Sequence, residues 1–115
     1  MTCVTKNEEN CDFLNQLDAT LAELAYDFEF GITDLCRTIG MSRTSLHRKI
    51  TTCSGKSISI YIREFRLAKA YELLTNGRQP IGHIAYSVGF SDLAYFSRCF
   101  KALYGQSPTD LRKEI

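Results

Sequence analysis

Basic, hydroxyl and imidazole side chains gather in a short stretch between Arg43 and Lys49, which reads Arg-Thr-Ser-Leu-His-Arg-Lys. These side chains suit contact with DNA, because arginine pairs with the O6 and N7 atoms of guanine and a threonine methyl meets the methyl of thymine. A second stretch, from Asp92 to Lys101, carries Arg98 among small and apolar residues. Whether either set can act together depends on the elements that carry it.

The pattern of apolar residues and helix breakers predicts only helices. The chain has two prolines, Pro80 and Pro108, and each precedes a helical pattern, where proline suits the first turn. Apolar residues recur at the helical spacing, and no useful length alternates as a strand does. The fold class is therefore predicted to be all-α, with helices over about 12–27, 33–39, 43–54, 58–75, 81–88, 93–104 and 108–114.

Hydroxyl and acidic side chains mark the expected helix starts, because their oxygens accept hydrogen bonds from the first backbone N–H groups. Thr33, Ser42 and Ser57 are predicted as such caps. The helix after residue 91 is capped by either Ser91 or Asp92. A second interpretation of Asp92 is that it reads cytosine.

The chain repeats itself with an offset of about 50 residues. Leu46, Arg48 and Ile50 fall on Phe96, Arg98 and Phe100, and the turn that contains Gly40 falls on the turn that contains Gly89. Each copy has a short helix, a glycine turn that we expect to need positive φ, and a longer helix, which is the helix-turn-helix pattern. Two copies in matching phase favour two helix-turn-helix subdomains joined by a long helix.

This organisation divides the chain into four segments. Residues 1–10 are expected to be a flexible lead, 11–56 the first helix-turn-helix subdomain, 57–76 the linker helix and 77–115 the second subdomain.

With Leu46 and Ile50 turned inward, the polar stretch lies on the outer face of the second helix of its unit. The start of such a helix is what enters a DNA major groove. The repeat places Arg98 where the first copy has Arg48, so both are predicted to read bases. The full predicted set of base contacts is Arg43, Thr44, Ser45, His47, Arg48, Leu93, Ala94, Ser97 and Arg98.

Contacts with DNA phosphates are predicted at helix starts and at nearby lysines. A solvated surface position is the simpler interpretation of Lys56, although it is kept in the set. Arg63 and Arg66 lie on the linker helix, where packing and ion pairing are more natural than DNA contact. The predicted phosphate contacts are Thr33, Ser42, Lys49, Lys56, Ser91 and Lys101.

The charge is unevenly distributed along the 115 residues. The net charge of +1 divides into −6 over residues 1–30, which hold seven acids and one base, and +7 over the remainder. The basic body suits a polyanionic partner. The five cysteines form no C-x-x-C pair, so neither a disulfide framework nor a metal site is predicted, and a reducing cytoplasm is expected. We expect no cofactor, no signal peptide and no membrane span.

Longer motifs resemble a known family. The stretch Ile81-x-x-Ile84-Ala85-x-x-x-Gly89-Phe90-Ser91, followed by Tyr95-Phe96-x-x-x-Phe100-Lys101-x-x-x-Gly105-x-Ser107-Pro108-x-x-x-Arg112, is similar to the signature of AraC/XylS transcription regulators. The first half is similar in Gly40-Met41-Ser42-Arg43 and in Arg66-Leu67-x-x-Ala70. The resemblance covers about residues 12–113; Leu111 departs from it, standing where an aromatic residue is usual.

The resemblance implies a sequence-specific regulator that inserts two recognition helices into adjacent major-groove segments of double-stranded DNA. It also implies RNA polymerase as a partner. The first helix and the stretch Ser42 to Ile50 look most like output domains of hybrid two-component regulators. The chain is either a stand-alone regulator or, as we favour, an output domain separated from an N-terminal sensor or receiver domain.

Two other classes of function remain as alternatives. An enzyme would use His47 with a nearby serine or cysteine, or accept a phosphoryl group on that histidine, but no third group, metal motif or phosphate loop supports it. A helical protein-interaction module would bind its partner with weak salt dependence, whereas DNA binding weakens steeply as salt rises.

Overall fold

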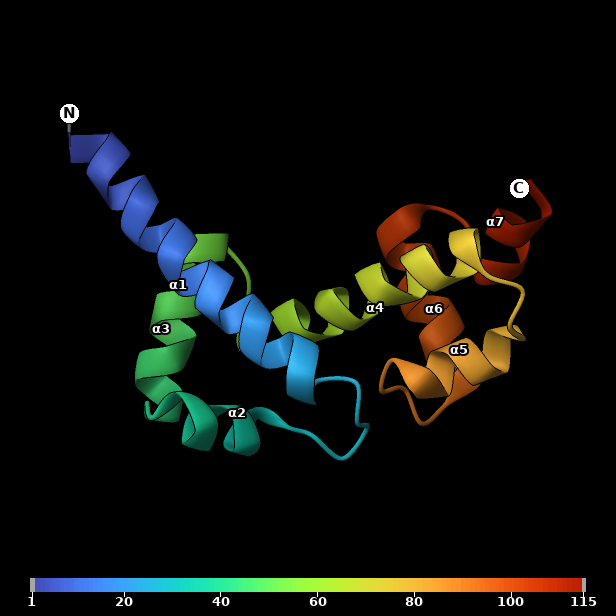
Figure 1. Cartoon of the computed structure of the whole chain (residues 1–115), viewed down its shortest axis with the longest axis horizontal. Helices are drawn as coiled ribbons and strands as arrows, with labels where there is room; N and C mark the ends of the chain where they lie inside the picture. Colours follow the sequence, from blue (N-terminus) through green and yellow to red (C-terminus); the bar gives the residue numbers. More distant parts are fainter. Residues whose placement is uncertain (1, 115) are drawn as a thin grey trace.

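The computed structural model describes the backbone of residues 2–114 and the side chains of residues 12–114. This part of the chain folds into helices, with no strand among the described residues, which confirms the all-α prediction (Figure 1). The seven helices of the described chain are α1 (Thr2–Leu24), α2 (Ile32–Ile39), α3 (Arg43–Ser54), α4 (Ile58–Asn76), α5 (Ile81–Ser87), α6 (Leu93–Tyr104) and α7 (Pro108–Glu114).

Two separate hydrophobic cores hold the molecule together. Helices α1, α2 and α3 enclose one core with the start of α4, and α5, α6 and α7 enclose the other with the end of α4 (Figure 1). The first core contains Phe13, Leu17, Leu21, Ala25, Leu35, Leu46, Ile50, Ile58 and Ile62. The second contains Leu67, Ala70, Leu74, Ile84, Ala85, Val88, Phe90, Phe96, Phe100 and Leu111.

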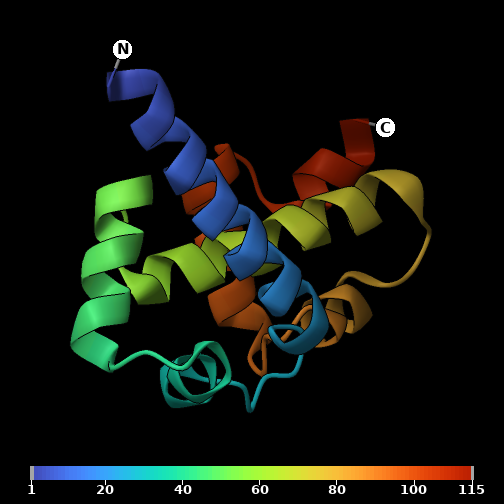
Figure 2. The ribbon, with the colours of Figure 1, turned by 60° about the vertical axis from the view of Figure 1, so that its left-hand side comes forward.

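Helix α4 belongs to both cores, which explains why its apolar residues cover more than one face. Ile58 and Ile62 are buried in the first core, and Leu67, Ala70 and Leu74 in the second. Its 19 residues span about 28 Å at 1.5 Å per residue. The helix therefore acts as a spacer between the two helical units, and the turned view shows it running past α1 (Figure 2).

Most of the predicted caps are confirmed. The Ser42 and Ser57 hydroxyls accept hydrogen bonds from the backbone N–H groups of Ser45 and Ile60. The expected positive φ of the two turn glycines is also present, at 80° for Gly40 and 103° for Gly89.

The prediction that Thr33 caps α2 is wrong. Gly31 precedes the helix as its cap residue, and its N–H donates to the carboxylate of Asp34 at 2.9 Å. Thr33 instead lies inside the first turn of α2, where its side chain is exposed. The accepting carboxylate belongs to the third residue of the helix and not to the cap position. A hydroxyl side chain at the start of the helix is therefore not the signal for this cap.

Helix α1 takes in most of the segment expected as a flexible lead, residues 1–10. The backbone of residues 2–10 forms the first turns of α1, and residue 1 lies outside the described residues. No glycine or proline occurs before Gly31, so nothing local interrupts the helix. The helix ends at Leu24, three residues before the expected Asp27.

Arg66 of α4 holds the turn that follows α1. Its Nε donates to the carbonyl of Ala25 at 2.6 Å, and its Nη2 donates to the carbonyls of Asp27 and Phe30 at 3.2 and 3.1 Å. Burial lowers the pKa of this arginine because it disfavours the charged form. The hydrogen bonds to the three carbonyls offset the cost of burying the charge. Arg66 therefore fixes the path of the chain from α1 into the first helix-turn-helix.

Candidate nucleic-acid interface

Helix α3 presents its polar residues outward, as predicted. Leu46 and Ile50 are fully buried and anchor the helix to the first core. The capping bond of Ser42 fixes where the helix begins and so sets which residues occupy its first turn. The exposed residues of its first two turns are Arg43, Thr44, Ser45, His47, Arg48 and Lys49.

Helix α6 follows the same plan in the second unit. Phe96 and Phe100 are fully buried, while Arg98 and Lys101 are exposed. Leu93 is 42% exposed and Ala94 is also exposed, so apolar surface is available to meet thymine methyls. Ser97 is half-buried and is the least accessible of the predicted base contacts.

Asp92 caps α6, which decides between the two interpretations of this residue. Its Oδ1 accepts hydrogen bonds from the N–H groups of Ala94 and Tyr95 at 2.9 and 3.3 Å. A carboxylate engaged in this way is a helix cap rather than a free acceptor for cytosine. Ser91 lies just before the cap, and its exposed side chain makes no hydrogen bond within the described chain.

The charged heads that face outward on the two helices are available for an anionic partner. Among described residues the ion pairs are Arg37 with Asp34, Lys56 with Glu64 and Lys69 with Glu72. Arg43, Arg48, Arg98 and Lys101 therefore have no carboxylate partner within the described chain. Unpaired guanidinium groups on a helix surface can form the bidentate bonds that guanine and phosphate accept.

The predicted phosphate contacts fall into two groups. Thr33, Ser42 and Ser91 lie at or next to helix starts, where the helix dipole favours an anion. Lys101 is exposed, and the Lys49 Nζ stands 4.6 Å from the centre of the Phe13 ring while its side chain remains exposed. Lys56 differs, because its Nζ lies 2.6 Å from Glu64 Oε1 and a phosphate would compete with that carboxylate.

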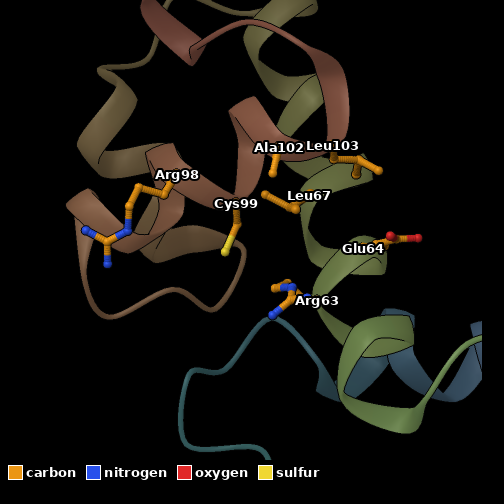
Figure 3. A pocket seen from close by; sticks show the side chains of 7 residues that line it. All are labelled: Arg63, Glu64, Leu67, Arg98, Cys99, Ala102 and Leu103. Carbon is orange, nitrogen blue, oxygen red and sulfur yellow. The ribbon is translucent and has the colours of Figure 1, made fainter.

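Two residues that the sequence did not single out for DNA join α4 to α6. The Arg63 Nη1 of α4 donates to the hydroxyl of Tyr95 on α6 at 3.1 Å. Arg63 and Arg98 also line one hollow of about 310 Å³ between these helices, with the side chains that Figure 3 labels. Tyr95 and Arg98 are three residues apart on one helix, a spacing that predicts contact between their side chains. No local pattern links either of them to Arg63.

Comparison with known proteins places this geometry in a family. A family model described as a helix-turn-helix domain matches residues 35–114, more than half of the chain. The chain belongs to this helix-turn-helix family. Its resemblance to AraC/XylS regulators is confirmed, and the domain is a DNA-binding domain of transcription regulators.

Curated relatives of this chain are much longer than the chain itself. The chain is 32% identical over 109 residues to the Msm operon regulatory protein of Streptococcus mutans, covering 95% of this chain and 39% of the relative. It is 37% identical over 99 residues to the transcriptional activator RhaR of Pectobacterium carotovorum, covering 86% and 34%. Histidine kinase P4 of Formosa agariphila matches over 81 residues at 33% identity, 70% of this chain but 6% of that protein. The chain thus spans less than half the length of these relatives.

Solved structures share the fold of this helix-turn-helix domain. The C-terminal domain of AraT, a response regulator from Geobacillus stearothermophilus, has a TM-score of 0.80 at 27% identity, covering 88% of this chain and 84% of that one. A Chromobacterium violaceum regulator of the AraC-type DNA-binding class has a TM-score of 0.75 at 28% identity, covering 86% and 88%. The DNA-binding domain of AdpA, solved with a target DNA, shares the fold with a TM-score of 0.80 at 22% identity, covering 88% and 90%.

No described helix is long and apolar enough to cross a membrane. Within the same part of the chain, no three His, Cys, Asp or Glu side chains lie close enough to hold a metal ion.

Proposed function

We propose that the domain binds a specific double-stranded DNA sequence by placing the first turns of α3 and α6 in two adjacent major-groove segments. The observation that carries this proposal is the matched position of Arg48 and Arg98. Both are exposed, both lie at the same place in the repeat, and both stand on capped helices whose opposite faces are fixed in a core.

The dimensions of the molecule suit this mode of binding. Successive major-groove segments on one face of DNA lie about 34 Å apart. The molecule measures 46 Å along its longest axis, and α4 separates the two helix-turn-helix units. One domain therefore has the length to reach both segments without a second copy.

The remaining base and phosphate roles follow from the same placement. Arg43, Thr44, Ser45, His47, Leu93, Ala94 and Ser97 would lie near base edges, with the half-buried Ser97 the weakest of them. Ser42, Thr33, Ser91, Lys49 and Lys101 would meet phosphates, and Lys56 only if Glu64 released it.

Partners beyond DNA also belong to the proposal. A relative that carries this domain is a transcriptional activator, and an activator must raise transcription by RNA polymerase, which is the second partner proposed. The likeness to the C-terminal domain of a response regulator supports a receiver or sensor domain as the third. The compartment is the cytoplasm, where bacterial DNA is accessible.

Selection from random double-stranded DNA tests the proposed function. We expect one enriched site with two conserved segments whose centres lie about 10 base pairs apart. Affinity for that site should fall with salt at a slope of about −0.9 per phosphate contacted. A protein-interaction module would enrich no sequence, and loss of phosphoramidate labelling in His47→Gln would favour the enzymatic alternative.

A further inference from the structure

A direct side-chain contact joins the linker helix to the second recognition helix. Arg63 lies on α4, and its Nη1 donates a hydrogen bond of 3.1 Å to the Tyr95 hydroxyl on α6. Tyr95 is 40% exposed, so this ring is held at the surface rather than inside the core. The contact therefore fixes an outward-facing ring on the helix that is proposed to read DNA.

The same ring supports Arg98. The Arg98 Cζ lies 5.9 Å from the centre of the Tyr95 ring, one helical turn along α6. On another side, Phe90 lies tilted against Tyr95 with ring centres 6.0 Å apart. Arg98 extends from α6 away from the other labelled side chains (Figure 3). Tyr95 thus links a guanidinium on α4 to a guanidinium that points outward.

The first helix-turn-helix unit lacks this arrangement. The repeat places Ser45 where the second unit has Tyr95, and within the described chain no aromatic ring lies under Arg48. The two arginines that are equivalent in sequence therefore differ in their surroundings, because an aromatic ring lies against Arg98 only.

We propose that Arg63 is a positioning residue for base reading by Arg98, because it holds the Tyr95 ring against which the Arg98 guanidinium rests. The proposal depends on the proposed base-reading role of Arg98. A flexible arginine loses rotamer freedom when it binds a base, and a side chain that is already ordered loses less. The smaller entropy loss strengthens binding only at the base pair that Arg98 reads. It therefore increases discrimination between the correct and the wrong base at that pair.

The test uses binding of the selected DNA site and of duplexes changed at single base pairs. Arg98→Ala first identifies the base pair that this residue reads. Tyr95→Phe then removes the hydroxyl that Arg63 bonds but keeps the ring, and Arg63→Met removes the donor but keeps the stem. Arg78→Met is the matched control for the lost charge, because Arg78 is exposed and has no hydrogen bond or ion pair within the described chain.

We expect Tyr95→Phe and Arg63→Met each to reduce discrimination at the Arg98 base pair about three- to tenfold. The double variant should lose no more than either single variant, because both remove one interaction. Discrimination at the base pair that Arg48 reads should stay unchanged in both, and Arg78→Met should leave both base pairs unaffected.

Two results would overturn the proposal in distinguishable ways. In the first, Arg98→Ala relaxes the preference at one base pair but Tyr95→Phe leaves that preference unchanged, so base reading stands and the positioning role of Arg63 is wrong. If Arg63→Met then lowers affinity evenly on all sequences, with a salt slope flatter by about 0.9, Arg63 contacts a phosphate instead. If Arg98→Ala relaxes no base pair, the proposed reading fails and the positioning role fails with it.

Discussion

At the scale of single residues, neighbouring cations on one helix are suited to different parts of DNA. Arg98 and Lys101 lie one turn apart on α6, and both are exposed. Arg98 has a planar head with five donors that matches the edge of guanine, whereas Lys101 carries a compact charge with no fixed direction. Base discrimination and general affinity should therefore separate between these two residues.

Substitution of the two residues tests this separation. Arg98→Ala should cost about 1–3 kcal/mol on the preferred site and relax the preference at one base pair. Lys101→Ala should weaken binding evenly on all sequences and flatten the salt slope by about one unit. Titration of a panel of single-base variants at several salt concentrations measures both effects. An even loss for Arg98→Ala, or a changed preferred sequence for Lys101→Ala, would contradict the assignment.

A second residue-scale prediction concerns the pair that joins α1 to α4. The Tyr61 hydroxyl donates to Asp18 Oδ1 at 2.6 Å, and burial together with this hydrogen bond raises the pKa of Tyr61 far above its usual value. Above pH 10 the unfolded chain releases the Tyr61 proton while the folded chain retains it, so the free energy of unfolding falls as pH rises.

Tyr61→Phe removes that proton from both states. The variant should be less stable by about 1 kcal/mol at pH 7, because it lacks the hydrogen bond. Its stability should then fall less steeply than that of the unchanged chain between pH 10 and pH 11. Denaturant melts across this range compare the two, and parallel curves would show that burial and the bond to Asp18 do not raise the pKa of Tyr61.

At the scale of elements, local sequence signals predicted the helices well. The features that they missed depend on contacts between residues far apart in the sequence. Serine caps and apolar spacing are local, so α3 and α4 begin where predicted. The turn after α1 is held by Arg66, which is 41 residues from Ala25, and a contact at that separation leaves no local pattern. In the same way the exposed faces of α3 and α6 were predictable from the repeat, whereas the contact of Arg63 with Tyr95 required the fold.

The cap of α6 gives an element-scale prediction. Asp92 accepts hydrogen bonds from two N–H groups at the start of the helix that carries Leu93, Ala94 and Arg98. Asp92→Ala should lower the free energy of unfolding by about 1 kcal/mol, while Asp92→Asn should retain most of it because asparagine caps equally well. Thermal melts measure the stability of both variants. Equal losses for the two would show that the carboxylate charge matters rather than the cap.

At the scale of the whole molecule, two cores could move independently if only α4 joined them. A second junction prevents this, where the turn of the second helix-turn-helix lies against the end of α1. A Cβ built on Gly89 would lie 2.7 Å from the carbonyl oxygen of Ala25 and 2.7 Å from Arg66 Nε. The hydrogen bonds of Arg66 to the carbonyls of Ala25 and Phe30, in the turn after α1, complete the junction. The distance between α3 and α6 is therefore set at two points.

Gly89→Ala should break this junction, and Gly105→Ala is its matched control. Both glycines have positive φ, 103° and 81°, but nothing lies within 4 Å of a Cβ on Gly105. Gly105→Ala should therefore cost only the backbone strain of about 1–2 kcal/mol. Gly89→Ala adds the overlap with Ala25 and Arg66 and should cost about 3 kcal/mol or more.

DNA binding distinguishes a loosened junction from a general loss of stability. A rigid molecule must lose affinity when one base pair is inserted between the two segments of its site, because each base pair displaces and rotates the second groove. In the cold, where both variants remain folded, Gly105→Ala should keep that spacing penalty in full. Gly89→Ala should reduce it, since the second unit is then tethered by α4 alone. An undiminished penalty in Gly89→Ala would mean that α4 by itself fixes the two recognition helices in register with DNA.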